Sequence, residues 1–97
     1  MPAYLLVDCD VTDPARYETY KKLAPPAIAK YGGRYLARGG ATTCLEGDWR
    51  PNRIVLLEFP DVETAQRFYA SPEYGAARAE RAGAAKMNMI LVAGLSA

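Results

Sequence analysis

The amino-acid sequence predicts an α+β fold with the element order β-α-β-β-α-β, in which helices cover one face of an antiparallel sheet. The main observation is an internal similarity between residues 5–11 and 55–62. Each segment is an apolar strand that ends in a carboxylate, and a helix with an aspartate at its start follows it. Similarity at about half the chain length is typical of a split β-α-β sandwich. The 97 residues fit one such domain, spanning residues 1–97.

The first strand and the first helix have clear local signals. Alternating side chains predict a strand over residues 3–11, and Asp13-Pro14 is a typical helix start. Apolar side chains then recur at three- and four-residue steps as far as Tyr31. Pro25-Pro26 lies inside this helix. Because proline lacks an amide donor, we expect the helix to kink or to restart there.

The remaining elements are a hairpin, two short helices and a final strand. Glycines and aspartate or serine caps mark their ends. The expected ranges are a strand over 34–38 that resumes at 42–45 after a bulge, a turn over 46–53, a strand over 54–59, helices from Asp61 and from Ser71 to about Arg81, and a strand over 87–95. The hairpin would set Glu46 opposite Arg53 as a cross-strand ion pair.

Composition and charge argue against several classes of protein. A net charge of +1 gives no field that attracts nucleic acid, so we expect no nucleic-acid partner. No apolar run approaches the ~20 residues of a membrane helix, and the start lacks a signal-type segment, so we predict a cytoplasmic protein without membrane contact. Histidine is absent, and Cys9 and Cys44 lack metal-site spacing. We therefore predict no metal and no cofactor.

The sheet face that the helices leave uncovered should be apolar. It is expected to carry Tyr4, Leu6, Leu56 and either Met87 or Ile90. A monomer rarely exposes so much apolar surface, and two such faces can pack about a two-fold axis. We therefore predict a homodimer, the alternative being an isolated monomer. Trp49 lies in an exposed turn, where it acts either as a lid or, in the interpretation we favour, as a dimer contact.

Two carboxylates are the candidate catalytic residues. If the internal similarity holds, Asp8 and Glu58 occupy matching places on adjacent, parallel strands, where their carboxylates are neighbours. Two close carboxylates raise one pKa, which can prepare a general acid or base near neutral pH. Alternatively, each ends a strand and pairs with an arginine, and no proton is transferred.

Arg38-Gly39-Gly40 is the candidate anion-binding segment. A guanidinium beside amides that glycine leaves accessible can hold a carboxylate in bidentate fashion. The alternative is a β-bulge with an ordinary salt bridge. Tyr20 and Tyr69 are expected to line the pocket walls, although tyrosines of this kind also serve as amphipathic core residues.

Four segments together resemble the domain of unknown function 1330 family. They are residues 32–40 (GGRYLARGG), 45–49 (LEGDW) with Pro51 and Arg53, 58–60 (EFP) and 68–74 (FYASPEY). The resemblance implies the dimeric α+β barrel superfamily, in which two ferredoxin-like protomers close their sheets around a central cavity. It implies no activity, because the family is named for lacking one. Relatives in the superfamily include quinol monooxygenases, haem-degrading enzymes and lactone isomerases, and several of these rely on histidine, which this chain lacks.

The family pattern extends over nearly the whole chain. It falls on Tyr20, Pro25, Gly33, Arg38, Gly39, Gly40, Glu46, Gly47, Trp49, Pro51, Arg53, Glu58, Phe59, Tyr69, Ser71, Pro72, Tyr74 and Arg81, and Phe68 stands where tryptophan is common. Glu46, Trp49 and Arg53 thereby join the candidate ligand-binding residues. We expect a homodimer that binds a small anionic molecule, for instance a carboxylate, between sheet and helices. A cofactor-free isomerase or monooxygenase and a non-catalytic dimerisation or metabolite-sensing module both fit the sequence.

Overall fold

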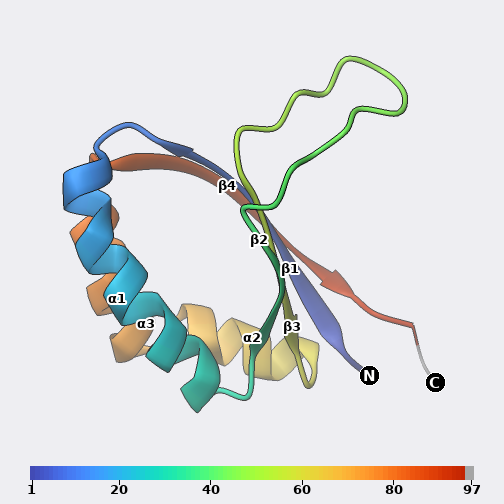
Figure 1. The fold of residues 1–97 in the computed structure, drawn as a ribbon. Helices are drawn as coiled ribbons and strands as arrows, with labels where there is room; N and C mark the ends of the chain where they lie inside the picture. Colours follow the sequence, from blue (N-terminus) through green and yellow to red (C-terminus); the bar gives the residue numbers. More distant parts are fainter. Residues whose placement is uncertain (96–97) are drawn as a thin grey trace.

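The computed structural model describes residues 1–95 and confirms the predicted α+β, ferredoxin-like architecture (Figure 1). The elements in chain order are β1 (Ala3–Val11), α1 (Pro14–Lys30), β2 (Arg34–Arg38), β3 (Ile54–Phe59), α2 (Val62–Tyr69), α3 (Pro72–Arg81) and β4 (Ala85–Ala93). The sheet has the strand order β2-β3-β1-β4, and each neighbouring pair is antiparallel. The helices lie against one face of the sheet, and the other face is left uncovered (Figure 1).

The expected parallel pairing of the first and third strands is wrong. β1 and β3 are neighbours but run antiparallel, with Asp8 opposite Ile54 and Glu58 opposite Tyr4. The reason is that the unit β1-α1-β2 and the unit formed by β3, the two short helices and β4 interleave. Each strand therefore lies beside a strand of the other unit, and the two neighbouring strands run in opposite directions. Asp8 and Glu58 are therefore about four residues, or ~13 Å, apart along the strands.

The extended hairpin predicted between the second and third strands is also wrong. β2 ends at Arg38, and residues 40–53 form a long loop that projects on the uncovered side of the sheet (Figure 1). Gly39, with a φ of 68°, begins the departure, and its amide donates to the Ile54 carbonyl over 2.8 Å. Pro51 lacks an amide donor, so it weakens the segment that would pair with residues 42–45. No ion pair joins Glu46 to Arg53 within residues 1–95.

The helix starts agree with the predicted caps. The Asp13, Asp61 and Ser71 side chains accept hydrogen bonds from the amides of Arg16, Thr64 and Tyr74, over 3.2, 2.7 and 3.1 Å. α1 continues through Pro25 and Pro26 to Lys30, so this helix does not restart at the prolines. Within residues 1–95, no helix has the length and apolar character needed to cross a membrane.

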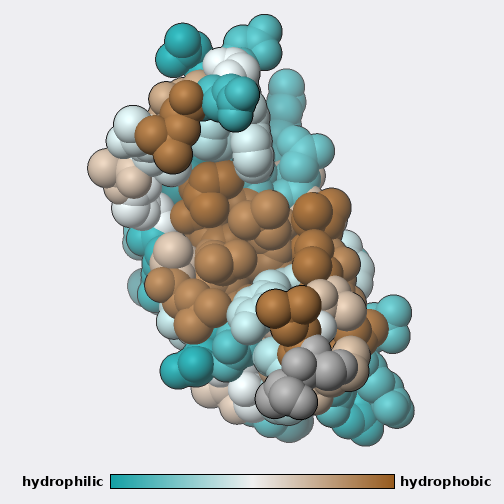
Figure 2. Space-filling view, turned by 90° about the vertical axis from the view of Figure 1, so that its right-hand side faces the viewer, coloured by the Kyte–Doolittle hydropathy of each residue, from teal (hydrophilic) through white to brown (hydrophobic). Residues whose placement is uncertain are grey.

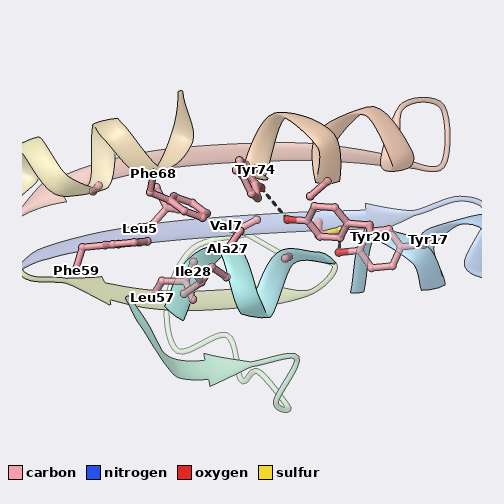
Figure 3. Close-up of a cluster of buried hydrophobic side chains, with 14 residues drawn as sticks. Leu5, Val7, Tyr17, Tyr20, Ala27, Ile28, Leu57, Phe59, Phe68 and Tyr74 are labelled. Atoms are coloured by element: carbon pink, nitrogen blue, oxygen red, sulfur yellow. Dashed lines mark hydrogen bonds between the residues drawn. The ribbon is translucent and has the colours of Figure 1, made fainter. Parts of the chain in front are cut away.

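The core lies between the sheet and the helices and combines aliphatic side chains with a cluster of aromatic ones (Figure 3). Phe68 is fully buried, and its ring centroid lies 4.9 Å from that of Phe59 and 4.4 Å from that of Tyr74. Met87 packs against this core. Of the two residues expected on the uncovered face, Met87 and Ile90, it is therefore Ile90 that lies there, opposite Leu6 in the sheet.

Gly33 lies in the connection between α1 and β2, where close packing against Ile28 of α1 and Phe59 of β3 requires a glycine. A Cβ at this position would lie 2.6 Å from Cε1 of Phe59 and 2.8 Å from Cγ2 of Ile28, and both side chains are buried. We expect Gly33→Ala to lower the free energy of unfolding by about 1–3 kcal/mol, because the added methyl group displaces the core. Urea unfolding measures the change.

Gly40→Ala is the matched control for this substitution. No atom lies within 4 Å of a Cβ built at Gly40, and its backbone has no positive φ. Its free energy of unfolding should stay within about 0.5 kcal/mol of the wild-type value. Equal losses of stability in the two variants would contradict this account of the packing.

Candidate functional site

A cavity of about 40 Å³ lies between the sheet and the helices. All four strands and all three helices contribute to its lining, so the whole sandwich positions it. Its walls are mostly aliphatic and aromatic, with Val7, Leu57, Met87 and Phe68 among them. Because one water needs about 10–15 Å³ by this measure, the cavity has room for only a few waters.

Four tyrosines line this cavity, namely Tyr17, Tyr20, Tyr35 and Tyr74. The hydroxyls of Tyr20 and Tyr74 form a buried hydrogen bond of 2.7 Å between α1 and α3 (Figure 3). Tyr17 lies one helical turn before Tyr20, with 5.1 Å between the ring centroids, and its hydroxyl accepts from the Cys9 thiol over 3.5 Å. Spacing of three residues places both rings on the same face of α1.

Burial keeps these phenols protonated. It raises the pKa of Tyr20 far above its ordinary value, and the nearby Tyr74 hydroxyl raises it further. Burial also raises the pKa of Tyr17, as does its hydrogen bond with Cys9. Burial raises the pKa of Tyr35 as well, although Arg38 and Arg53 act in the opposite direction. Near neutral pH the three hydroxyls therefore act as hydrogen-bond donors rather than as bases.

The polar end of the cavity carries cations. Lys21, Arg38 and Arg53 belong to the lining, which includes no aspartate or glutamate among residues 1–95. Lys21 pairs with Glu18 over 3.2 Å, whereas Arg38 and Arg53 form no ion pair in the described chain. The Arg38 Cζ lies 4.6 Å from the centroid of the Tyr35 ring. The cavity therefore presents guanidinium groups to any ligand that enters from this side.

The structure brings only some of the predicted ligand-binding residues to this cavity. Tyr20, Arg38 and Arg53 line it, whereas Tyr69 lies 41% exposed at a separate groove. The Gly39 amide is bonded to the Ile54 carbonyl, so it is not available to an anion. Gly40 is exposed at the start of the loop and does not line the cavity.

The two candidate catalytic carboxylates lie elsewhere, on the uncovered face of the sheet. Asp8 accepts hydrogen bonds from the amides of Asn52 and Arg53, over 3.0 and 3.4 Å, and so holds the end of the loop. Glu58 forms an ion pair of 3.0 Å with Arg34. The hypothesis of a carboxylate pair that shares a proton thus has no geometric basis, and both groups have structural partners.

The uncovered face is a broad apolar surface (Figure 2). Its apolar side chains come from the three longest strands, and Ile90 and Val92 are 56% and 47% exposed. The 62% exposed Trp49 of the loop lines two hollows on this face, of about 500 and 150 Å³, each together with Leu6 and Ile54. Glu46 lines the larger hollow, so Glu46 and Trp49 belong to this face rather than to the cavity.

Sequence reasoning did not identify Lys21, Tyr35 or Tyr74 as cavity residues. The spacing of Tyr17 and Tyr20 on one helix is a local signal, and the alternation in β2 could have placed Tyr35 on the helix side. No local signal places Tyr74 beside Tyr20, because the two are 54 residues apart in the chain. Within residues 1–95, no group of three or more His, Cys, Asp or Glu side chains gathers where it could hold a metal ion.

Comparison with solved structures gives full-length matches to the fold. A protein of unknown function from Rhodopseudomonas palustris is similar, with a TM-score of 0.76, 20% identity, and coverage of 99% of this chain and 84% of that one. A dimeric ferredoxin-like protein of unknown function from Jannaschia sp. CCS1 has a TM-score of 0.70 at 11% identity, covering 97% and 100% of the two chains. SnoaB, a cofactor-independent oxygenase from Streptomyces nogalater, has a TM-score of 0.66 at 15% identity, covering 99% and 95%.

Sequence comparison identifies the family. A search of curated proteins finds no significant match to this chain. A family model described as a domain of unknown function, DUF1330, matches residues 2–95. The match covers every helix and strand of the described chain, and so includes the cavity and the uncovered face. The chain therefore belongs to the DUF1330 family.

Proposed function

We propose that this protein is a homodimer that binds a small, planar, anionic organic molecule in the cavity between sheet and helices. One observation carries the proposal: Arg38 and Arg53 line a mostly apolar cavity without a carboxylate partner in the described chain. A guanidinium in such surroundings favours a planar carboxylate or phenolate, with which it forms charge-assisted hydrogen bonds. The protonated tyrosine hydroxyls supply further donors to the same anion.

The small volume of the cavity sets a condition on binding. A ring-sized ligand needs more than 40 Å³, so side chains must move to admit it. Arg38 is exposed, and Lys21 is partly exposed and held only by an exposed ion pair with Glu18. Such pairs are worth ~0–1 kcal/mol, so displacing these side chains costs little. The ligand would enter between them and lie against the tyrosines.

The homodimer is supported by the apolar, uncovered sheet face with its hollows beside Trp49. Packing of two such faces removes apolar surface from water and closes the hollows. The similar protein from Jannaschia is described as dimeric and ferredoxin-like, which supports the same assembly here. Asp8 and Glu58 then have a structural role at the borders of this face.

Oxygenation without a cofactor is the second candidate function. The cavity lining of the described chain contains no carboxylate base, which argues against an isomerase that removes a proton with Asp or Glu. An electron-rich phenolate held by arginines can itself reduce dioxygen. For example, a ring CH₂ can become C=O: one atom of O₂ becomes the carbonyl oxygen, and the other leaves as water with the two hydrogens of the CH₂. Similarity to the oxygenase SnoaB supports this reaction class. A non-catalytic metabolite-binding module uses the same cavity without that step.

Calorimetric titration with benzoate and with its neutral analogue benzamide tests the binding proposal. We expect benzoate to bind more tightly, and Arg38→Gln or Arg53→Gln to weaken it about 10- to 100-fold, as for a charge-assisted hydrogen bond. Arg50→Gln is the matched control, because Arg50 lies in the loop and does not line the cavity. Equal affinity for the two compounds, or unchanged benzoate binding in the cavity variants, would refute the proposal. Oxygen uptake in the presence of anthrone, whose ring CH₂ can become C=O, compared between the wild type and Arg38→Gln, tests the oxygenation.

A further inference from the structure

A second groove lies on the helix-covered side of the sheet, between α2 and the edge strand β4. It has a volume of about 480 Å³ and is lined by Leu5, Ala65, Gln66, Tyr69, Met89 and Leu91. Met89 is the one lining residue that it shares with the central cavity. Because β4 ends the sheet, the groove opens to solvent along this edge. It is thus large enough for a small molecule and separate from the proposed anion cavity.

Tyr69, which lines this groove, stacks with an arginine that has no anionic partner in the described chain. The Arg78 Cζ lies 4.4 Å from the ring centroid of Tyr69 and 5.9 Å from that of Tyr74. Its Nε is buried and has no hydrogen-bond partner, and Arg78 forms no ion pair within residues 1–95. Stacking on tyrosine uses the face of the guanidinium plane and leaves its in-plane donors for a ligand.

The surroundings of Arg78 add positive charge rather than compensate it. Arg81 lies three residues further on the same face of α3, 5.5 Å from the Tyr20 ring centroid. Its guanidinium interacts with the Tyr74 and Tyr20 hydroxyls, and its Nε is buried without a partner. Glu73, at the start of α3, is engaged by Lys30 and by the Tyr31 hydroxyl, over 3.3 and 3.0 Å. A desolvated guanidinium with unmet donors favours an incoming anion.

We propose that this groove binds a small amphiphilic carboxylate, such as a medium-chain fatty acid. Its carboxylate would pair with Arg78 beside the Tyr69 hydroxyl, and its alkyl chain would lie over Leu91 and Met89. Apolar side chains and a flexible methionine suit an unbranched chain, and the unpaired guanidinium suits its head group. This ligand differs from the planar anion of the central cavity, and the two linings share only Met89.

Titration with octanoate and with its neutral analogue octanamide tests the proposal. We expect the wild type to bind octanoate at least 10-fold more tightly than octanamide, and Arg78→Gln to abolish that difference. Arg38→Gln should leave octanoate binding unchanged, whereas it weakens benzoate binding if the central cavity is used. The two variants therefore separate failure of this proposal from failure of the proposed function.

Methyl chemical shifts of the wild-type protein give a test that does not require a stable variant. Octanoate should shift the Met89 and Leu91 methyl signals and leave those of Leu23, an exposed α1 residue outside the groove, in place. Binding without these shifts would overturn the proposal, as would equal affinities for octanoate and octanamide. Unchanged octanoate affinity in a folded Arg78→Gln protein would also overturn it.

Discussion

Replacing Ile90 by aspartate is expected to turn the proposed dimer into a folded monomer of 10.6 kDa. Ile90 is 56% exposed in the single chain, so an aspartate there stays hydrated and leaves the fold intact. In a two-fold dimer each protomer would bury one such carboxylate in the interface, so two carboxylates lose their hydration. At ~3 kcal/mol for each buried carboxylate, the dissociation constant should rise about 10⁴-fold.

Light scattering coupled to gel filtration measures the mass of each protein. Leu23→Asp is the matched control, because Leu23 is an exposed apolar residue of helix α1, on the opposite side of the molecule. This variant should remain a dimer. A wild-type protein that stays monomeric at high concentration would refute the dimer, and so would an Ile90→Asp protein that still dimerises.

Alkaline pH is expected to remove several kcal/mol of stability through the cavity tyrosines. The pKa values of Tyr17 and Tyr20 lie well above their ordinary value of 10.0 in the folded protein. Above about pH 10 the unfolded chain therefore loses protons that the folded chain keeps, and the free energy of unfolding falls as pH rises. Each group contributes about 1.4 kcal/mol per pH unit, so the pair removes ~5 kcal/mol between pH 10 and pH 12. A domain of this size has roughly 5–15 kcal/mol in total.

Tyr20→Phe should reduce this slope by about 1.4 kcal/mol per pH unit, because one phenol no longer titrates. Losing the hydrogen bond to Tyr74 lowers stability at neutral pH as well, by ~1 kcal/mol. Ile28→Val controls for that loss, since it weakens the same core but keeps every tyrosine and hence the slope. Urea unfolding across this pH range at one protein concentration measures the slopes. Identical slopes in the wild type and Tyr20→Phe would contradict the account.

Local features of this fold could be predicted from the sequence because neighbouring residues determine them. Asp13, Asp61 and Ser71 each begin a helix, since a short polar side chain reaches the amide three residues ahead. Side-chain alternation likewise separated the two faces of β1. The apolar, uncovered face followed from the same alternation.

Non-local features could not be predicted in the same way. The relative direction of β1 and β3 depends on how the two β-α-β units interleave, and the internal similarity suggested the wrong direction. That error placed Asp8 and Glu58 together, although the register separates them. The hydrogen bond between Tyr20 and Tyr74 joins distant parts of the chain, and no local pattern contains it.

Interleaving also determines how the chain can acquire its structure. β1 lies between β3 and β4, and the strands of either half, β1 with β2 or β3 with β4, are not neighbours. Neither half can therefore form a hydrogen-bonded sheet by itself. β1 can pair with β3 along one edge, but its other edge stays unpaired until β4, which ends at Ala93, is available. On the ribosome the strands β1, β2 and β3 can pair before α2 and α3 are made, but the four-stranded sheet is completed only when both halves of the chain are present.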